Sequence, residues 1–309
     1  MDTQRKSNVA TIGKYSLVKK LGTGATSKVY LGYDSVTKNP VALKILINSD
    51  PKLVSAIKNE VALQKDLRHK NILQVQELCE SVILSDANAK TQTVTTLVLE
   101  YASGGDILQL IEKLKVFPEP LARTYFQQLI SALEYLHQNE IAHNDIKPEN
   151  ITLDGMYNIK LADFGCAVSL SRKKTFTSLV GTSKYFPPEM HQGLGYEGAA
   201  YDLFATAVTT FCMVLGYMPF AKATELDTLY SLLMKGKSKI FWRSHEALFA
   251  EKLPKMAISS DFQDLMTKML DPNPQRRLTI EEIKSHPWYN GPTLTKSELL
   301  SAVKAAKRA

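Results

Sequence analysis

The stretch IAHNDIKPEN, residues 141–150, guides the interpretation of the whole sequence. Within six positions it holds a carboxylate (Asp145), an ammonium group (Lys147) and a carboxamide (Asn150). A second carboxylate, Asp163, follows at the glycine turn of the run LADFG. Carboxylate and amide oxygens are hard ligands, which suit Mg²⁺ that carries phosphate groups. The sequence therefore predicts a site for Mg²⁺ and phosphates.

Composition excludes several other classes of protein. The 309 residues are 44% hydrophobic and 22% charged, which is ordinary for a globular chain. No apolar run reaches the roughly 18 residues that span a bilayer, and the start, MDTQRKSNVA, has no signal-peptide core or myristoylation glycine. The cysteines form no C-x-x-C pair, which suits a reducing compartment. We predict a cytoplasmic or nuclear protein with no membrane partner.

The net charge of +7 raises the question of nucleic-acid binding. A nucleic-acid footprint needs clustered basic residues, whereas the lysines and arginines here are mostly scattered. The local runs RKK (172–174) and KAAKRA (304–309) are typical of solvated surface. We therefore predict no nucleic-acid partner.

The hydrophobic pattern changes near residue 101. Before it, KYSLVKKL (14–21), PVALKIL (40–46) and TVTTLVLEY (93–101) indicate strands, with a helix over 51–68 and a hairpin loop over 85–92. After it, the period is 3.6 and predicts helices. One apolar stripe comprises Ala122, Phe126, Leu129, Leu133 and Leu136.

These patterns predict an α+β fold with two lobes and a ligand site in the cleft between them. We divide the chain into a flexible N-terminal segment (1–13), a strand-rich lobe (14–101), a helical lobe (102–290) and a basic C-terminal tail (291–309). The stretch 241–260 is interpreted as an insertion, with no assigned role.

Two motifs in the strand-rich part suit phosphate binding. LGTGATSKVY (21–30) has glycines that let backbone N–H groups approach phosphate oxygens, although an ordinary glycine hairpin has the same pattern. In VALK, the period of a strand puts Ala42 and Lys44 on one face. Glu60, on the following helix, is the natural ion-pair partner of Lys44; otherwise the lysine head reaches water.

In their order, the motifs LGTGATSKV, VALK, HNDIKPEN, DFG and PPE resemble those of the eukaryotic protein kinases, from about Lys14 to Tyr289. The resemblance implies a bilobal protein kinase-like fold that uses ATP and Mg²⁺. It also implies a role for each residue of the set. Lys44 holds the α and β phosphates and pairs with Glu60, Asp145 orients the substrate hydroxyl and accepts its proton, Lys147 neutralises the γ-phosphate, and Asn150 and Asp163 hold Mg²⁺.

The resemblance further implies which residues contact the nucleotide. They are Leu21, Gly22, Thr23, Gly24, Ala25, Ser27 and Val29 of the glycine loop, then Ala42, Lys44, Leu99, Glu100, Ala102 and Thr152. Three positions depart from the family pattern. Ser27 replaces a glycine, Thr152 stands where an apolar residue usually lies under the adenine, and Gln64 stands at an apolar position of the helix.

Other segments indicate the branch of the family. Lys147 with Thr182 resembles the serine/threonine branch, and GTSKYFPPE (181–189) resembles the segment that seats the acceptor residue. Glu189 is expected to pair with Arg277. The ending IKSHPWY is most similar to the calcium/calmodulin-dependent and AMP-activated kinase group. These features predict a protein kinase that phosphorylates Ser or Thr of protein substrates and has a regulatory protein or an upstream kinase as a further partner.

Two alternatives remain. Gln64 and Asn144 would suit a pseudokinase scaffold that binds nucleotide or partners without efficient catalysis, but the full set of Lys44, Glu60, Asp145, Asn150 and Asp163 favours an active enzyme. A small-molecule kinase of related fold is disfavoured by the segment GTSKYFPPE.

Asp106 and Glu149 match positions that hold a substrate arginine in basophilic kinases, and Cys212 stands where a further acidic residue would complete that site. We therefore predict a moderate preference for Arg or Lys three residues before the acceptor. The alternative is that both carboxylates are solvated surface.

The tail has Thr295 and Glu298 at capping-box spacing and an apolar strip of Leu299, Leu300 and Val303. Docking on the helical lobe and autoinhibition are both open, but a frayed helix in solvent is the preferred interpretation at this length.

Asn144 occupies a position where most of the family has an arginine that binds the phosphate of the activation loop. Val168 and Ala56 stand where the other phosphate-binding basic residues are usual. We therefore predict substantial basal activity, with phosphorylation of Ser178 or Thr177 a modest modulator. In the alternative interpretation, the RKK run takes over the phosphate.

Overall fold

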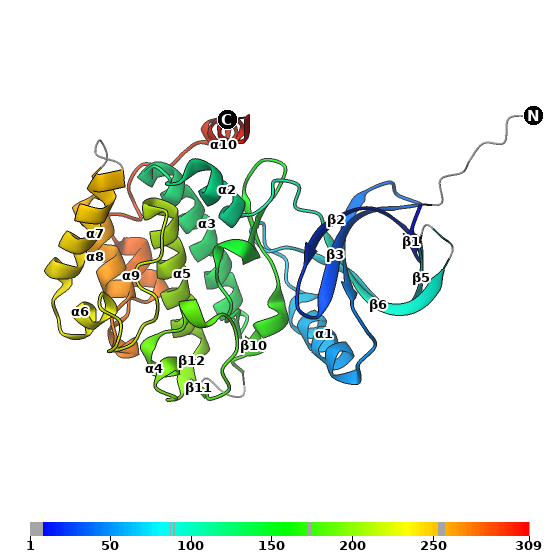
Figure 1. Ribbon diagram of the computed structural model, residues 1–309, viewed down its shortest axis with the longest axis horizontal. Coiled ribbons are helices and arrows are strands. Elements are labelled where there is room, and N and C mark those ends of the chain that lie inside the picture. The colour runs from blue at the N-terminus through cyan, green and yellow to red at the C-terminus, as the bar shows by residue number, and fades with distance from the viewer. Residues whose placement is uncertain (1–8, 87, 89, 172–174, 253–256, 309) are drawn as a thin grey trace, which may run out of the picture. The chain divides into compact units, whose positions relative to one another are not determined.

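The computed structural model describes residues 9–86, 88, 90–171, 175–252 and 257–308. The chain divides into two compact units (Figure 1). The first comprises the residues up to Arg68 together with Leu73–Ser103, and the second comprises His69–Ile72 and the chain from Gly104 onward. The first unit is mostly strands and the second mainly helices, so the α+β protein kinase fold is confirmed.

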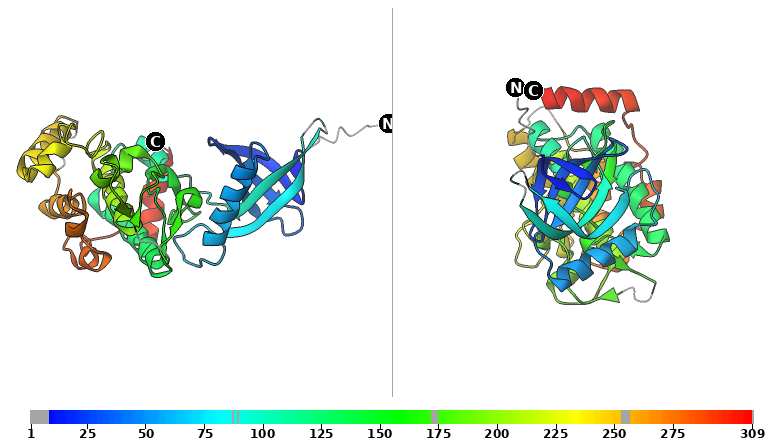
Figure 2. Two further views of the ribbon diagram at one scale, coloured as in Figure 1. Left: turned by 90° about the horizontal axis from the view of Figure 1, so that it is seen from below. Right: turned by 90° about the vertical axis from the view of Figure 1, so that its right-hand side faces the viewer.

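The first unit is a closed barrel of six antiparallel strands in the order β1-β2-β3-β4-β6-β5, with one helix beside it (Figure 2). Its elements are β1 (Thr11–Ile12), β2 (Tyr15–Thr23), β3 (Ser27–Asp34), β4 (Pro40–Leu46), α1 (Pro51–Gln64), β5 (Val75–Ser85) and β6 (Thr91–Glu100). Val41, Leu43 and Ile45 point from β4 into the barrel core, as the alternation in VALK predicted.

Two expectations for this unit need correction. The segment 1–13 is not flexible throughout, because β1 pairs with both β2 and β5 and Ile12 is buried in the barrel core. The helix expected over 51–68 ends at Gln64. It begins where the Asp50 side chain accepts a hydrogen bond from the backbone N–H of Lys52, ahead of a proline that suits a first turn.

The second unit is built around the two long helices α3 and α5, with short strands at the loops. Its first elements are α2 (Ile107–Leu114), α3 (Glu119–Gln138), β7 (Ile141–Ala142), η1 (Pro148–Asn150), β8 (Ile151–Leu153), β9 (Ile159–Leu161), η2 (Phe164–Cys166) and β10 (Val168–Ser169). There follow β11 (Thr175–Phe176), η3 (Ser183–Tyr185), α4 (Pro188–His191), β12 (Tyr196–Glu197) and α5 (Gly198–Leu215). The last are α6 (Tyr230–Met234), α7 (Ser238–Lys252), α8 (Ser260–Met269), η4 (Pro274–Arg276), α9 (Ile280–Ser285) and α10 (Lys296–Arg308).

Helices α3 and α5 form the core of this unit. The predicted stripe on α3, from Ala122 to Leu136, is fully buried. Helix α5 is buried on nearly all sides and ends at Gly216, whose φ of 77° is a left-handed cap. By length and hydropathy α5 could span a membrane, which the sequence analysis did not anticipate, but 89% of it is buried inside the unit. It is therefore packed as a core helix.

The stretch 241–260 is largely helical and packed. Residues 241–252 belong to α7, and Phe241, Trp242 and Phe249 are buried. Residues 253–256 lie outside the described part of the chain. The described part of this stretch thus belongs to the core of the second unit, through contacts such as that of the Trp242 ring with Phe211.

The tail forms α10, and the expectation of a frayed helix in solvent is wrong. Leu299 and Val303 are 2% and 0% exposed, because α10 packs against α2. The predicted capping box is present: the Thr295 N–H donates to the Glu298 carboxylate at 2.8 Å, and the Glu298 N–H donates to the Thr295 hydroxyl at 3.4 Å.

Candidate active site

Asp145 lies in the loop between β7 and η1 and is surrounded by donors. The Lys147 ammonium group donates to one carboxylate oxygen at 2.7 Å, and the Asn150 amide donates to the same oxygen at 2.9 Å. The Thr182 hydroxyl donates to the other oxygen at 2.8 Å. Lys147 also donates to the Thr182 hydroxyl at 2.8 Å. A carboxylate, a cation and a hydroxyl thus meet at one point, and Asp145 itself is only 7% exposed.

Asp202 of α5 fixes the backbone of this loop. One of its carboxylate oxygens accepts the N–H of His143 at 2.9 Å, and the other accepts the N–H of Asn144 at 2.7 Å. His137 contacts the same carboxylate at 2.9 Å. Sequence reasoning missed Asp202, although a lone aspartate in an apolar run was a usable signal, since a buried carboxylate needs partners.

A second set of bonds joins the loop to the DFG turn. The Ala162 N–H donates to the Asn150 carbonyl at 2.8 Å, which brings Asp163 next to Asn150. The Asp145 N–H donates to Nδ1 of His143 at 3.3 Å. Nδ1 is therefore an acceptor, so Nε2 carries the ring proton and donates to the Ala162 carbonyl at 3.0 Å. The His143 ring also packs edge-on against Phe164, with centroids 4.8 Å apart.

The residues predicted to hold Mg²⁺ fit that ion in their chemistry. The Asn150 amide nitrogen is engaged by Asp145, which orients the amide and leaves its oxygen as the ligand atom. Asp163 adds a carboxylate and has a left-handed backbone with φ of 62°. Mg²⁺ commonly takes few protein oxygens and completes its shell with water and phosphate. No cluster of three His, Cys, Asp or Glu side chains suited to a metal is found among the described residues.

In the first unit, the predicted pair of Lys44 and Glu60 is present. The Lys44 ammonium nitrogen lies 2.8 and 2.9 Å from the two carboxylate oxygens of Glu60. The two side chains are 14% and 5% exposed. A buried pair with both oxygens engaged holds the lysine head in one position, which a phosphate-binding role requires.

The other predicted nucleotide residues of this unit lie on neighbouring strands. Register pairs Ala42 with Leu99 across β4 and β6, and Val29 with Lys44 across β3 and β4. The turn between β2 and β3 is closed by a hydrogen bond from the Gly24 N–H to the Ser27 carbonyl at 2.8 Å. The remaining ones are Leu21, Gly22 and Thr23 in β2, Ala25 in the turn, Glu100 in β6 and Ala102 just after it. Thr152 belongs to β8 of the second unit.

Two departures from the family pattern are accommodated by hydrogen bonds. The Thr152 hydroxyl donates to the Lys160 carbonyl at 2.7 Å. The buried Gln64 amide donates to the Leu73 carbonyl at 2.7 Å, while its oxygen is without a partner among the described residues. Both polar side chains therefore keep a hydrogen bond inside their own unit, so neither departure leaves a side chain wholly unsatisfied.

The acceptor segment is anchored by the predicted pair of Glu189 and Arg277. Two parallel bonds of 2.7 and 2.6 Å join the guanidinium group to the carboxylate. Arg277 also lies over the Phe204 ring at 4.9 Å. Such a bidentate buried pair fixes the end of the segment 181–189 to the helical core.

Asp106 and Glu149, the predicted substrate-arginine site, interact electrostatically. Burial and, to a smaller degree, the charge of Glu149 raise the pKa of Asp106. Asp106 also caps α2, accepting the Gln109 N–H at 2.8 Å. Burial and the neighbouring Glu149 raise the pKa of Cys212 to about 12. Cys212, which stands where a further acidic residue would complete that site, is therefore a protonated thiol.

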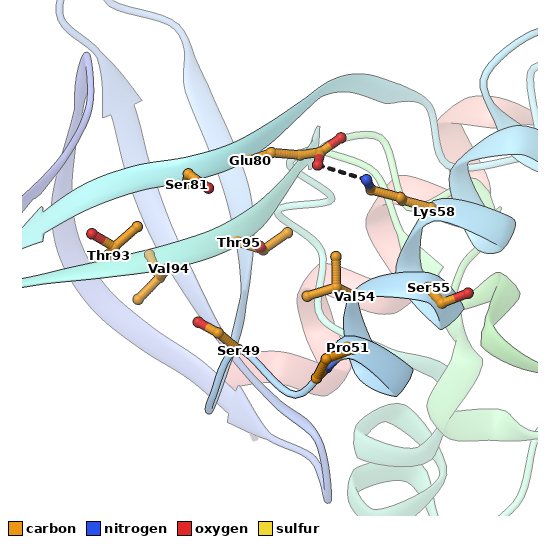
Figure 3. Close-up of a pocket in the computed structure, with 10 residues that line it drawn as sticks. All are labelled: Ser49, Pro51, Val54, Ser55, Lys58, Glu80, Ser81, Thr93, Val94 and Thr95. Carbon is orange, nitrogen blue, oxygen red and sulfur yellow. Dashed lines mark ion pairs between the residues drawn. The ribbon is translucent and has the colours of Figure 1, made fainter.

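A separate pocket of about 550 Å³ lies in the first unit where α1 meets β5 and β6 (Figure 3). The Lys58 ammonium group and the Glu80 carboxylate are 2.7 Å apart at its edge. Its walls are Ser49, Pro51, Val54, Ser55, Lys58, Glu80, Ser81, Thr93, Val94 and Thr95. None of these is a predicted nucleotide residue.

The barrel, the helical unit and the Asp145 cluster define a protein kinase domain. Comparison with protein families agrees: residues 15–289 match the family described as "Protein kinase domain", and the chain belongs to that family.

The most similar relatives narrow the group. They include CBL-interacting protein kinase 32 of Oryza sativa subsp. japonica, 35% identical over 286 residues, which are 90% of this chain and 59% of that protein. CBL-interacting serine/threonine-protein kinase 16 of Arabidopsis thaliana is 30% identical over 303 residues, which are 94% of this chain and 59% of that protein. The chain thus spans under two thirds of these relatives. The predicted likeness to the calcium/calmodulin-dependent and AMP-activated kinase group is confirmed.

Proposed function

We propose that this chain is an ATP-dependent serine/threonine protein kinase that transfers the γ-phosphoryl group to Ser or Thr of protein substrates. The observation that carries the proposal is the Asp145 cluster. There a buried carboxylate accepts a hydrogen bond from the Thr182 hydroxyl at 2.8 Å beside the ammonium group of Lys147. A substrate hydroxyl in the same relation to Asp145 is oriented for attack on a phosphorus atom.

In this mechanism, each residue positions an atom or balances a charge. Asp145 holds the acceptor hydroxyl and takes its proton as the new O–P bond forms, while the bond from the γ-phosphorus to the bridging β-phosphate oxygen breaks and ADP leaves. Lys147 lies on the same carboxylate and offers positive charge to the transferred phosphoryl oxygens. Lys44, held in place by Glu60, binds phosphate oxygens through its ammonium group. Little covalent work is required of the protein, since this reaction depends on positioning and electrostatic stabilisation.

ATP and Mg²⁺ are the cofactors that this set implies. Mg²⁺, when bound, neutralises charge on the β and γ phosphates. We assign its binding to the Asn150 amide oxygen and the Asp163 carboxylate. Glycine-loop residues from Leu21 to Val29 and the strand residues Ala42 and Leu99 are assigned to the nucleotide. Nucleotide-induced thermal stabilisation that requires Mg²⁺ would support this assignment without depending on catalysis.

The test compares wild type, Asp145→Asn and Asp154→Asn for phosphate transfer from Mg·ATP to Ser/Thr peptide arrays. Asp154 is a matched control, because it is an aspartate of the same unit that accepts backbone N–H groups in a turn. We expect Asp145→Asn to lower kcat by roughly a hundredfold or more, with normal nucleotide binding, and Asp154→Asn to stay near wild type. Equal labelling by Asp145→Asn and wild type would refute the role of Asp145. Nucleotide binding without any transfer would instead favour the scaffold.

We further propose that Asp106 and Glu149 recognise Arg or Lys three residues before the acceptor. The support is that α2, which Asp106 caps, packs against η1, which contains Glu149, and that carboxylate–guanidinium bonds are strong. A peptide with Arg at that position should have a kcat/KM about tenfold above its Ala counterpart. Asp106→Asn should reduce the difference while keeping the α2 cap, since Asn is also a good cap. Equal rates on the two peptides would reject the preference.

A regulatory protein is the further partner that we propose. The support is that the similar kinases are named as CBL-interacting. The measurement is titration calorimetry of this chain with a CBL protein, with and without Ca²⁺. If no heat of binding is measured at micromolar concentrations, residues 1–309 do not bind such a partner and the proposal is wrong.

A further inference from the structure

The first residues of the segment 175–183 lie against β12. Thr175 and Phe176 form β11, which pairs antiparallel with Tyr196 and Glu197 of β12. Beyond that short ladder, the Tyr196 hydroxyl donates to the Ser178 carbonyl at 3.1 Å. The segment is thus tied to β12 both by backbone pairing and by one side chain.

Tyr196 is itself firmly placed. It is 2% exposed, and its ring lies 5.9 Å from the Phe176 ring and 5.8 Å, edge-on, from the Tyr201 ring. Tyr201 packs in turn against Phe186, also edge-on at 5.8 Å. Burial raises the pKa of Tyr196 to about 12, so its hydroxyl keeps its proton and remains a donor at neutral pH. Aromatic contacts of this geometry favour one ring orientation.

The same segment reaches the Asp145 cluster four residues after Ser178. Gly181, with φ of 94°, lies against Asn144 and Tyr201, and a Cβ there would stand 2.6 Å from the Tyr201 hydroxyl oxygen. Thr182 then donates to Asp145 at 2.8 Å. Only three residues separate Ser178 from Thr182, so the bond that holds Ser178 also restricts where Thr182 can lie.

We infer that Tyr196 is a positioning residue, which holds the segment 175–183 so that Thr182 stays on Asp145 without any modified side chain. This inference rests on the proposed function for its effect on rate. Its structural part, the hold on the segment, does not depend on catalysis. The aromatic rings and β12 set where Tyr196 lies, and its hydroxyl sets where Ser178 lies.

The test uses Tyr196→Phe, which removes the hydroxyl and keeps the ring. Tyr230→Phe is the matched control, because the Tyr230 hydroxyl donates to a backbone carbonyl, that of Leu270, at 3.2 Å in the buried core of the same unit. Both variants and wild type are dephosphorylated first. Amide hydrogen exchange is followed for peptides that cover 175–183, and kcat and KM are measured for a Ser/Thr peptide and for ATP.

Loss of one such bond changes a local equilibrium by roughly threefold to tenfold. For Tyr196→Phe we expect exchange of 175–183 to accelerate by that factor. We also expect kcat/KM for the peptide to fall by that factor, with KM for ATP unchanged. For Tyr230→Phe we expect neither change. Unaltered exchange in Tyr196→Phe, or equal changes in both variants, would overturn the inference. If wild type transfers no phosphate, the proposed function fails, and the exchange comparison still decides whether Tyr196 holds the segment.

Discussion

Asn144 lies in the loop that carries Asp145, with a left-handed backbone, φ of 60°, and no exposed surface. Asparagine tolerates this conformation better than most residues. Within the described part of the chain, neither its amide nitrogen nor its amide oxygen has a hydrogen-bond partner. A neutral side chain here leaves no buried charge that a phosphate on the activation segment would have to neutralise. The position of the RKK run lies outside the described residues.

From this we predict that the dephosphorylated protein retains most of its activity. Purified protein is treated with phosphatase, mass spectrometry confirms that residues 171–183 are unmodified, and the peptide phosphorylation rate is compared with that of untreated protein and of Ser178→Ala. All three rates should agree within a few-fold. A tenfold fall, equivalent to about 1.4 kcal/mol in the barrier, would show that a loop phosphate is required.

At the scale of elements, α7 brings a histidine into an aromatic cluster. His245 has no exposed surface, and its ring lies 4.4 Å from Phe241 and 4.8 Å from Phe211, measured between centroids. The backbone of Pro219 faces the ring and favours its protonated form, but this effect is smaller than that of burial. Burial lowers the pKa of His245 from 6.5 to about 4. The ring is therefore neutral in the folded protein at pH 7.

This gives a signed prediction for stability against pH. Between about pH 7 and pH 4 the unfolded chain binds the His245 proton more readily than the folded protein, so lowering the pH favours unfolding. Above this range the stability does not depend on the protonation of His245. Below it, the resulting destabilisation levels off at a few kcal/mol at most. Urea unfolding of wild type and His245→Phe at several pH values should show a shallower dependence in the variant.

His69 and His191 also have pKa values lowered by burial, and they remain in both proteins. The difference in slope between wild type and variant therefore isolates His245, whatever the variant does to stability at pH 7. Parallel curves would contradict the assignment.

Elements that depend on a repeating pattern were predictable, and those that depend on distant partners were not. The α3 stripe follows from a period of 3.6, and the pairs Lys44–Glu60 and Glu189–Arg277 follow from a resemblance with fixed positions. Strands β11 and β12 have two residues each, which is too short to show a hydrophobic periodicity in the sequence. The hydrogen bond from Tyr196 to Ser178 could not be predicted either, because it depends on the pairing of these two strands. A buried polar residue such as Asp202 can be noticed in the sequence, because it interrupts an apolar run. The sequence does not show which residues donate hydrogen bonds to it.

At the scale of the whole molecule, α10 joins the last described residues to the start of the second unit. The Lys307 ammonium group donates to the Gly104 carbonyl and lies 5.0 Å from the centre of the Tyr157 ring. Burial and the charge of Lys113 lower the pKa of Lys307, while the charge of Asp106 acts in the opposite direction. The sequence could show that this helix is amphipathic, but its apolar strip gave no sign of which surface covers it.

The last prediction is that removing α10 destabilises the second unit. Full burial of Leu299 and Val303 is worth roughly 1.5–3 kcal/mol each, from which the cost of ordering the helix is subtracted. We expect truncation after Thr295 to lower Tm by roughly 3–8 °C. Truncation after Gly291 is less clean, since it also removes Pro292, whose carbonyl accepts a bond from Arg123 at 2.6 Å.

Two point variants separate packing from charge in this prediction. Lys304 is exposed, so Lys304→Ala should leave Tm and activity near wild type. Lys307→Met keeps the apolar strip but removes a cation beside Asp106, so KM for a peptide with Arg three residues before the acceptor should fall a few-fold. The matching Ala peptide should show little change, because it offers no cation to Asp106. An unchanged Tm in the truncated protein would show that α10 does not dock in solution. An unchanged KM in Lys307→Met would show that the charge of Lys307 does not affect substrate binding.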